Sequence, residues 1–351
     1  MFDISIIIPF HRDVAILRRV LTPFRDRPAT CEVVIAVDGP SSEDWESVAR
    51  EFGAATVQLP VNGGPAAARN RGADVARGAI LVFVDGDVIA APDAVERICT
   101  VMREHADVGA VFGAYDETPE APGFVSQYRN LSHRYVHRTT SREARTFWAG
   151  LGAVRAHAFR AVGGFDESFT RPSIEDIELG YRLTAAGHRV LVEPTIEGKH
   201  LKRWTFSSSV RSDLFDRGIP WTQLLLRVKS GQTDLNLTTG LRLSVVASYL
   251  LVLFSVFAIL SPIAGVLAVA SLVALLSMNW KYYQYFATVR GWWFAARVVP
   301  LHFVHHLCNG LSFLTGSALF HAHRLFRWTL PGTLSLRSAD HRPGGRATLG
   351  A

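Results

Sequence analysis

The chain has 351 residues, long enough for two domains, and its 37 Lys and Arg against 31 Asp and Glu give a net charge of +6. This mild excess forms no basic stripe, so it favours phosphate-bearing ligands or an anionic membrane surface and argues against nucleic-acid binding. The cysteines, Cys31, Cys99 and Cys308, are widely spaced and support neither a disulfide framework nor a zinc site.

Residues 1 to about 230 alternate strand-like and helix-like stretches, which is typical of an α/β domain with a mainly parallel sheet. The chain begins with a strand-like run and lacks the features of a secretory signal, so we expect this part to stay in the cytoplasm. The predicted strands are 4–9, 31–39, 54–60 and 79–87, and the predicted helices are 14–24, 42–52 and 62–78.

Polar residues follow three of the predicted strands: 9–12 after the first, Asp38 after the second and Asp85-Gly86-Asp87 after the fourth. Ligands of open α/β sheets gather at these strand ends. The GxGxxG pattern of dinucleotide-binding domains does not follow the first strand. We therefore expect a different nucleotide site at this edge, with Pro9 and Arg12 among its contacts.

The Asp85-X-Asp87 arrangement suits a hard divalent cation. Mg²⁺ and Mn²⁺ prefer oxygen ligands and are often held by one or two carboxylates together with the phosphates of a substrate. Arg69 and Arg71, in the helix before this strand, would add positive charge for a nucleotide diphosphate. The alternative is a plain turn, because Asp and Gly are common turn residues.

Two apolar runs, 240–260 and 262–278, are at or near the length that spans a bilayer, and a Ser-Pro turn separates them. We interpret them as a helical hairpin in the membrane; the alternative is a pair of buried helices in a soluble domain.

A third run, 294–320, carries Arg297, His302, His305 and His306, so it is a span with a polar face, a re-entrant segment or an interfacial segment. The tail, 321–351, is basic and expected to be disordered. Because basic segments stay on the cytoplasmic side, two or four crossings fit this tail better than three.

Several segments together carry a resemblance to a known family. SIIIPFHRD, VVIAVDGPSSED, NGGPAAARNRGADVARGAILVFVDGD and GGFDESFTRPSIEDIELGYRLTAAGH stand in the order found in family 2 glycosyltransferases, and the match covers about the first 205 residues. The resemblance implies a GT-A type nucleotide-sugar-binding domain over 1–230, with membrane helices over 240–320 and the tail over 321–351.

The resemblance also implies roles for individual residues. Asp38 would contact the base of the nucleotide, Asp87 would bind the metal, and Asp85 would orient the ribose or the metal shell. Gly150 and Gly152 would form the floor beneath the donor sugar. For Asp38, the alternative is a turn-forming acid before Gly-Pro.

Glu175 and Asp176 occupy the place of the family's acid pair, in which one carboxylate acts as general base, and we choose Asp176 for that role. The alternative is a structural one, because Ser173 followed three residues later by an acid resembles a helix capping box.

The segment KHLKRWTF (199–206) is similar to the QxxRW motif of processive polysaccharide synthases, with His200 in the place of glutamine. His200 is a candidate third metal ligand or diphosphate contact, or else a structural histidine. Arg203 and Trp204 are candidate donor contacts, Arg203 through the diphosphate.

Two further segments, 124–138 and 209–221, combine aromatic and basic residues as interfacial helices do. In the first, Phe124, Tyr128, Leu131 and Tyr135 recur at helical spacing. The alternative for both segments is packing against the core of the domain itself.

We therefore expect a multi-pass protein of a bacterial inner membrane, with a cytoplasmic catalytic domain that depends on Mg²⁺ or Mn²⁺. It would transfer a sugar, with inversion, from a nucleotide donor, preferably a UDP-sugar, to a lipid, lipid-linked or polysaccharide acceptor. The alternatives are a polyprenyl-phosphate sugar synthase, a nucleotidyltransferase and a non-catalytic membrane regulator that binds nucleotide sugars.

Overall fold

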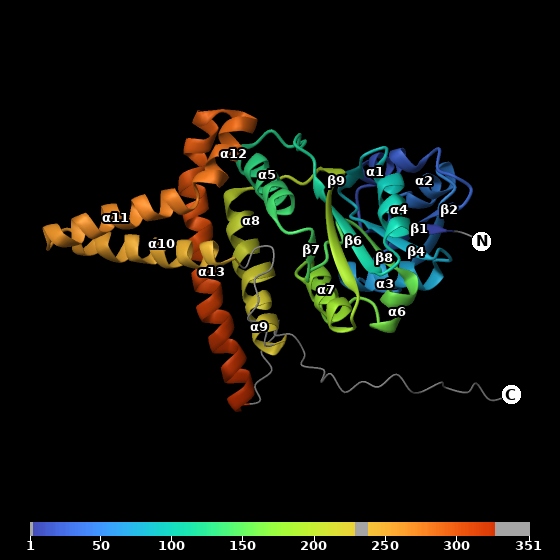
Figure 1. The fold of residues 1–351 in the computed structure, drawn as a ribbon. Helices are drawn as coiled ribbons and strands as arrows, with labels where there is room; N and C mark the ends of the chain where they lie inside the picture. The colour runs from blue at the N-terminus through green and yellow to red at the C-terminus, as the bar shows by residue number, and fades with distance from the viewer. Residues whose placement is uncertain (1–2, 229–237, 327–351) are drawn as a thin grey trace.

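The computed structural model describes residues 3–228 and 238–326. It contains an α/β part built on one sheet and a helical part at its side (Figure 1). The expected domain boundary falls within 229–237, and most of the expected tail falls within 327–351, so both lie outside the described residues.

Within the described residues, nine strands form one sheet in the order β3-β2-β1-β4-β8-β6-β9-β5, and β7 pairs with β9. The strands are β1 (Ile4–Phe10), β2 (Cys31–Val37), β3 (Ala55–Gln58), β4 (Ile80–Val84), β5 (Val88–Ala90), β6 (Val108–Tyr115), β7 (Glu143–Ala144), β8 (Leu151–Arg155) and β9 (Arg189–His200). All four strands predicted from the first 87 residues are present.

The sheet is mixed, so the expectation of a mainly parallel sheet needs correction. β1 to β4 pair in parallel, as does β6 with β9, but β8 lies between β4 and β6 and is antiparallel to both. The antiparallel direction has a consequence for the site. It brings the start of β8 to the edge at which β4 ends, where the Asp85 N–H donates to the Gly150 carbonyl at 3.1 Å.

Helices cover the sheet, and their starts follow from the local sequence. Asp13 and Asp44 cap α1 and α2 by accepting backbone N–H groups with their side chains. α3 packs on β1 and β2, and α4 packs on β6 and β9. The helices of this part are α1 (Val14–Leu21), α2 (Trp45–Glu51), α3 (Gly64–Val75), α4 (Ala94–Glu104), α5 (Phe124–Thr139), α6 (Ala156–Ala161) and α7 (Glu175–Ala185).

The helical part follows β9. Its elements are α8 (Phe206–Arg211), the π-helix η2 (Ser212–Gly218), α9 (Ile219–Val228), α10 (Thr239–Phe257), α11 (Pro262–Met278), α12 (Trp280–Arg290) and α13 (Trp292–Phe326).

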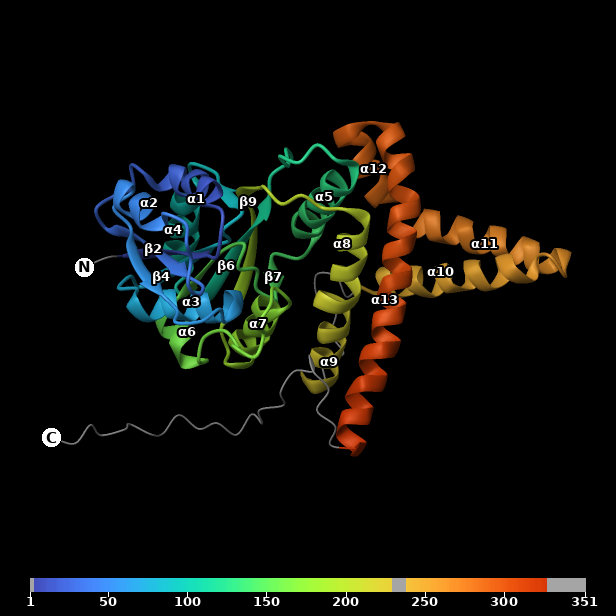
Figure 2. The ribbon, with the colours of Figure 1, turned by 180° about the vertical axis from the view of Figure 1, so that it is seen from behind.

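α10 and α11 form a hairpin that projects away from the sheet (Figures 1 and 2). Apolar side chains at its tip are exposed, among them Ile259, Leu260 and Ile263. Among the described helices, α10 is long and apolar enough to cross a membrane, and α11 with α12 gives a second candidate only if that pair, bent by 61°, is one span. Such an exposed apolar surface is unusual unless a partner or a bilayer covers it.

The third apolar run belongs to α13, and the three histidines of this run, His302, His305 and His306, contact protein. His302 and His306 are buried, and His305 lies 2.9 Å from Asp213 of η2. α13 packs along α9, η2 and α12. These histidines would be costly in a lipid-exposed membrane span, and their contacts within the protein account for their presence in α13.

The first of the two segments expected at the membrane surface, 124–138, forms most of α5. For two of its residues the expected position is wrong. Tyr128 and Leu131 are buried and pack with Phe286 of α12 and Val298 of α13. They cover neither a bilayer nor the core of the α/β part, because α12 and α13 occupy this face of α5.

Gly113 in β6 offers a test of the β6–β9 pairing. A Cβ atom at Gly113 would lie 1.9 Å from the backbone oxygen of Ile196, whereas one at Gly123 would meet nothing within 4 Å. We expect Gly113→Ala to lower the free energy of unfolding by at least about 2 kcal/mol, because backbone must move. Gly123→Ala is the control. Equal unfolding curves for the two variants in detergent would contradict the pairing.

Candidate active site

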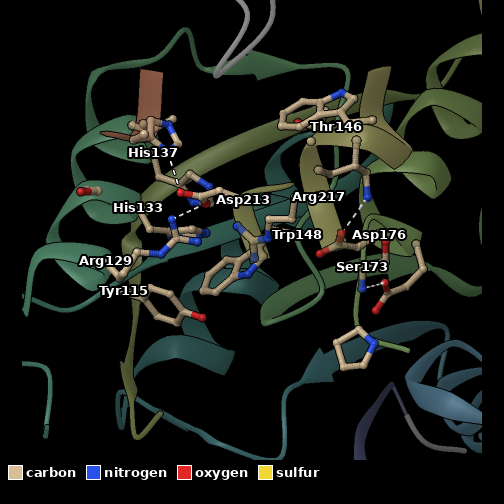
Figure 3. A pocket seen from close by; sticks show the side chains of 18 of the residues that line it. Tyr115, Arg129, His133, His137, Thr146, Trp148, Ser173, Asp176, Asp213 and Arg217 are labelled. Carbon is tan, nitrogen blue, oxygen red and sulfur yellow. Dashed lines mark hydrogen bonds and ion pairs between the residues drawn. The ribbon is translucent and has the colours of Figure 1, made fainter. Parts of the chain in front are cut away.

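A cavity of about 2440 Å³ lies between the strand ends of the sheet and the helical part. Figure 3 shows Asp176, Trp148 and Arg217 around this hollow. The structure brings to it most of the residues chosen from the sequence: Pro9, Arg12, Asp38, Arg69, Asp85, Asp87, Glu175, Asp176, His200 and Trp204. Gly150, Gly152 and Arg203 are not among the lining residues.

Arg69 joins the two acidic motifs. Its buried guanidinium lies 2.5 Å from Asp85 Oδ1 and 2.9 Å from Glu175 Oε1. Burial disfavours the charged form, but the carboxylates of Asp85, Glu175 and Asp176 outweigh burial and raise the pKa of Arg69. With both carboxylates already bound, the Arg69 guanidinium holds the acids in place and is a weaker candidate for a direct donor contact.

Glu175 and Asp176 begin α7 and have different surroundings. Glu175 is buried, and its oxygens accept from Arg69 and from the Ser173 N–H. Asp176 is partly buried at the cavity wall and accepts from the backbone N–H groups of Ala149 and Ile177, at 3.1 and 2.8 Å. The surrounding protein and the charge of Glu175 raise the pKa of Asp176 to about 6. Of the two acids, Asp176 is therefore the one poised to take up a proton near neutral pH.

Asp87 faces the end of β9. Its Oδ2 lies 3.5 Å from His200 Nε2, because β5 pairs with β9 in the register Val88↔His200. The surrounding protein opposes ionisation, but His200 and Lys202 lower the pKa of Asp87. Tyr115 stacks on the His200 ring at 4.3 Å and fixes its orientation.

The pair formed by Asp87 and His200 fits a divalent cation. It supplies an ionised carboxylate and an oriented imidazole on one side of the cavity. Among the described residues, no group of three or more His, Cys, Asp and Glu side chains could hold a metal ion. A cation at this place would need further ligands from a phosphate-bearing substrate and from water, which is the usual arrangement for Mg²⁺.

Asp38 is tied to the start of α3. Its carboxylate accepts from the backbone N–H groups of Gly63 and Gly64, at 2.8 and 3.1 Å. A negative charge at a helix start is favourable, so this contact accounts for the buried acid without a ligand. A contact from Asp38 to a nucleotide base stays a prediction.

Gly150 and Gly152 do not line the cavity, and their predicted role beneath the donor sugar stays a prediction. A Cβ at Gly150 would lie 2.4 Å from the Trp148 ring, and a Cβ at Gly152 would lie 2.4 Å from the Trp148 carbonyl oxygen. The two glycines make room for Trp148, and Trp148 lines the cavity in their place. The small residues in FWAGLG are visible in the sequence, but which neighbour fills their space is not.

The predicted contact of Arg203 with the diphosphate also stays a prediction. Arg203 is exposed and does not line the cavity, whereas the residues on either side of it, Lys202 and Trp204, do. Lys202 lies over the Trp204 ring, with its Nζ 4.3 Å from the ring centroid. Arg217 of η2 also lines the cavity, although it is not among the residues chosen from the sequence. The sequence around it indicates only an amphipathic segment.

Comparison with known proteins agrees with this geometry. Residues 5–163 match the sequence profile of Glycosyl transferase family 2. The validoxylamine A glucosyltransferase of Streptomyces hygroscopicus subsp. limoneus is 29% identical, over 52% of this chain and 48% of that protein. The succinoglycan biosynthesis protein ExoA of Rhizobium meliloti (strain 1021) is 30% identical, over 50% of this chain and 53% of that protein. The chain thus spans about half the length of the curated relatives it matches.

A solved structure supports the fold. The mannosyltransferase PcManGT from Pyrobaculum calidifontis, in complex with GDP-Man and Mn²⁺, superimposes with a TM-score of 0.56 at 17% identity, over 89% of this chain and 87% of that chain. This likeness confirms the expected GT-A fold.

Arg69 provides a test of the link between the acidic motifs. We expect Arg69→Met to lower the free energy of unfolding by about 3–5 kcal/mol, because it leaves the buried Glu175 carboxylate unpaired. Arg71→Met in the same helix is the control, since Arg71 is exposed. Denaturant unfolding of the detergent-solubilised protein measures both. Similar losses for the two variants would contradict the role of Arg69.

Proposed function

We propose that this protein, whose residues 5–163 match Glycosyl transferase family 2, transfers a sugar from a nucleotide donor, preferably a UDP-sugar, to a hydroxyl group of a lipid or lipid-linked acceptor. The observation that carries the proposal is the pair of sites in one cavity. Asp176, with its raised pKa, provides a base, and Asp87 with His200 provides a place for a cation.

The transfer is a single displacement. The acceptor oxygen forms a bond to the anomeric carbon, and the bond from that carbon to the diphosphate oxygen breaks with its electron pair. The acceptor proton passes to the Asp176 carboxylate. Because attack and departure occur on opposite faces, the configuration at the anomeric carbon inverts. Arg69 donates to the Glu175 carboxylate and holds it in place beside the base.

Asp87 and His200 would hold the divalent cation, Mg²⁺ or Mn²⁺. When bound, such a cation offsets the negative charge that develops on the leaving diphosphate. The chain itself keeps Asp87 ionised through His200 and Lys202, so the carboxylate is ready as a ligand. Lys202 adds a positive charge at the same wall of the cavity.

The shape of the cavity supports a lipid or lipid-linked acceptor. From the strand ends it reaches Leu241, Val245 and Val246 of α10 and Phe313 of α13. α10 is a candidate membrane span, and the α10–α11 hairpin exposes apolar side chains. We propose that this hairpin anchors the protein in the membrane, with the sheet on the cytoplasmic side, so that an acceptor enters from the bilayer.

The first experiment measures nucleotide diphosphate release by the purified protein with membrane lipid extract, Mn²⁺ and a panel of UDP- and GDP-sugars. We expect lipid-dependent release with one donor and a loss of at least about 100-fold in Asp176→Asn and Asp87→Ala. Asp74→Asn on the exposed face of α3 is the control.

Each other outcome has a defined meaning. Release that survives Asp176→Asn would indicate a phosphate acceptor, which needs no base, as in a polyprenyl-phosphate sugar synthase. Release of pyrophosphate would indicate nucleotidyl transfer. Binding of a donor by the wild type without release would indicate the non-catalytic regulator.

The pH dependence of transfer tests the choice of base. A general base works when deprotonated, and the pKa of Asp176 is about 6. We expect kcat/KM to rise about tenfold from pH 5 to pH 7 and then to level off. Melting curves across the same range control for unfolding. A rate that is flat or falls between pH 5 and pH 7 would exclude Asp176 as the base.

A further inference from the structure

The π-helix η2 (Ser212–Gly218) lies within the segment 209–221, packs against α8, α9 and α13, and has no role in the proposed mechanism so far. π-helical turns are rare and frequently occur at functional sites. Three residues of η2, Asp213, Arg217 and Gly218, line the cavity, and the first two are charged.

Asp213 is the anchor of this segment. Its carboxylate is buried and lies 2.5 Å from the Arg129 guanidinium of α5 and 2.9 Å from His305 Nδ1 of α13. These partners outweigh the effect of burial and lower the pKa of Asp213. His305 is held in turn by Asn309, one turn further along α13, at 3.1 Å. Asp213 therefore joins three helices through an ionised carboxylate.

The other end of η2 is fixed as well. A Cβ at Gly218 would lie 2.3 Å from the Ser312 hydroxyl oxygen of α13, so this contact has no room for a side chain. The Arg129 guanidinium also lies over the Trp204 ring, 4.9 Å from its centroid. The backbone N–H of Trp204 donates to the Ser126 hydroxyl oxygen at 2.8 Å. The segment that carries His200, Lys202 and Trp204 thus packs against Arg129, which also binds Asp213.

Arg217 lies between these fixed points and faces the cavity (Figure 3). Within residues 3–228 and 238–326, no carboxylate lies within ion-pair distance of its guanidinium. Its charge contributes to lowering the pKa values of His133 and His137 on α5 and opposes the rise at Asp176, so it acts on the site itself. An arginine held beside a catalytic acid without an acidic partner calls for an anionic ligand.

We propose that Arg217 binds the diphosphate of the nucleotide donor and that Asp213 is its positioning residue, acting through η2. The inference rests on the proposed function, which supplies a diphosphate at this place. A guanidinium matches phosphate oxygens with two parallel N–H groups, which Lys202 cannot do. Asp213, Asp85 and Glu175 are already bound to arginines, so they do not compete for Arg217.

Nucleotide binding tests the first part without any need for turnover. The probes are UDP, GDP and the corresponding nucleosides, titrated calorimetrically in Mn²⁺ into wild type, Arg217→Ala and Arg217→Lys. We expect Arg217→Ala to raise the Kd of the preferred nucleotide diphosphate roughly tenfold or more, with the nucleoside Kd unchanged and with partial recovery in Arg217→Lys. Arg211→Ala is the control, because Arg211 is exposed on α8 and lies outside the cavity lining.

The results separate this inference from the proposed function. An unchanged diphosphate Kd in Arg217→Ala, or equal losses for nucleotide and nucleoside, would overturn the role of Arg217. Wild-type binding without sugar transfer would overturn the proposed function and leave the role of Arg217 intact. A wild type that binds no nucleotide diphosphate would overturn both.

A double-mutant cycle tests the positioning role of Asp213. We expect Asp213→Asn and the milder His305→Gln to weaken diphosphate binding in the wild-type background and to have little further effect when Arg217 is already alanine. His305→Gln keeps the measurement possible if Asp213→Asn does not fold. Equal losses in both backgrounds would show that Asp213 only stabilises the fold.

Discussion

The candidate active site depends on one buried positive charge, the guanidinium of Arg69. The edge of the sheet gathers the carboxylates of Asp85, Glu175 and Asp176, and like charges at this distance would oppose each other's ionisation. Arg69 resolves the conflict by bridging Asp85 and Glu175. Asp176 has no such bridge, and burial together with the charge of Glu175 raises its pKa to about 6. Arg69 belongs to α3. This helix contains neither Asp85 nor the acid pair of Glu175 and Asp176, yet it fixes the geometry of both.

The antiparallel strand β8 supplies the second constraint. Because β8 begins where β4 ends, Trp148 and Ala149 reach the strand-end edge from a distant part of the sequence. The Ala149 N–H then donates to Asp176, and Trp148 covers Gly150 and lines the cavity. A wholly parallel sheet would place this segment at the opposite edge. The mixed topology is thus a condition for the site.

The sequence predicts the first four strands and the acids at their ends, because these features depend on local hydrophobic patterns and on spacing within one segment. It does not predict the direction of β8, which depends on contacts between residues 67 to 75 positions apart, from Val84↔Leu151 to Ile80↔Arg155. For the same reason the sequence misses Trp148 and Arg217 and favours Arg203 over Lys202, since a motif fixes the order of side chains but not which of them turns inward. The choice of Asp176 over Glu175 could be guessed from the resemblance, whereas the causes of the raised Asp176 pKa, burial and the neighbouring Glu175 charge, are visible only in the structure.

The histidines of α13 explain both why this helix packs within the protein and how it holds η2. Its histidines are costly in a lipid-exposed span, yet here His302 and His306 are buried in protein and His305 binds Asp213. The helix thereby holds η2 against α5, and η2 presents Arg217 to the cavity. α10 and α13 also line that cavity, so the helical part contributes to the candidate site itself. It forms a wall of the candidate active site, and we infer that a truncated chain ending after β9 would lose that wall together with the α10–α11 hairpin.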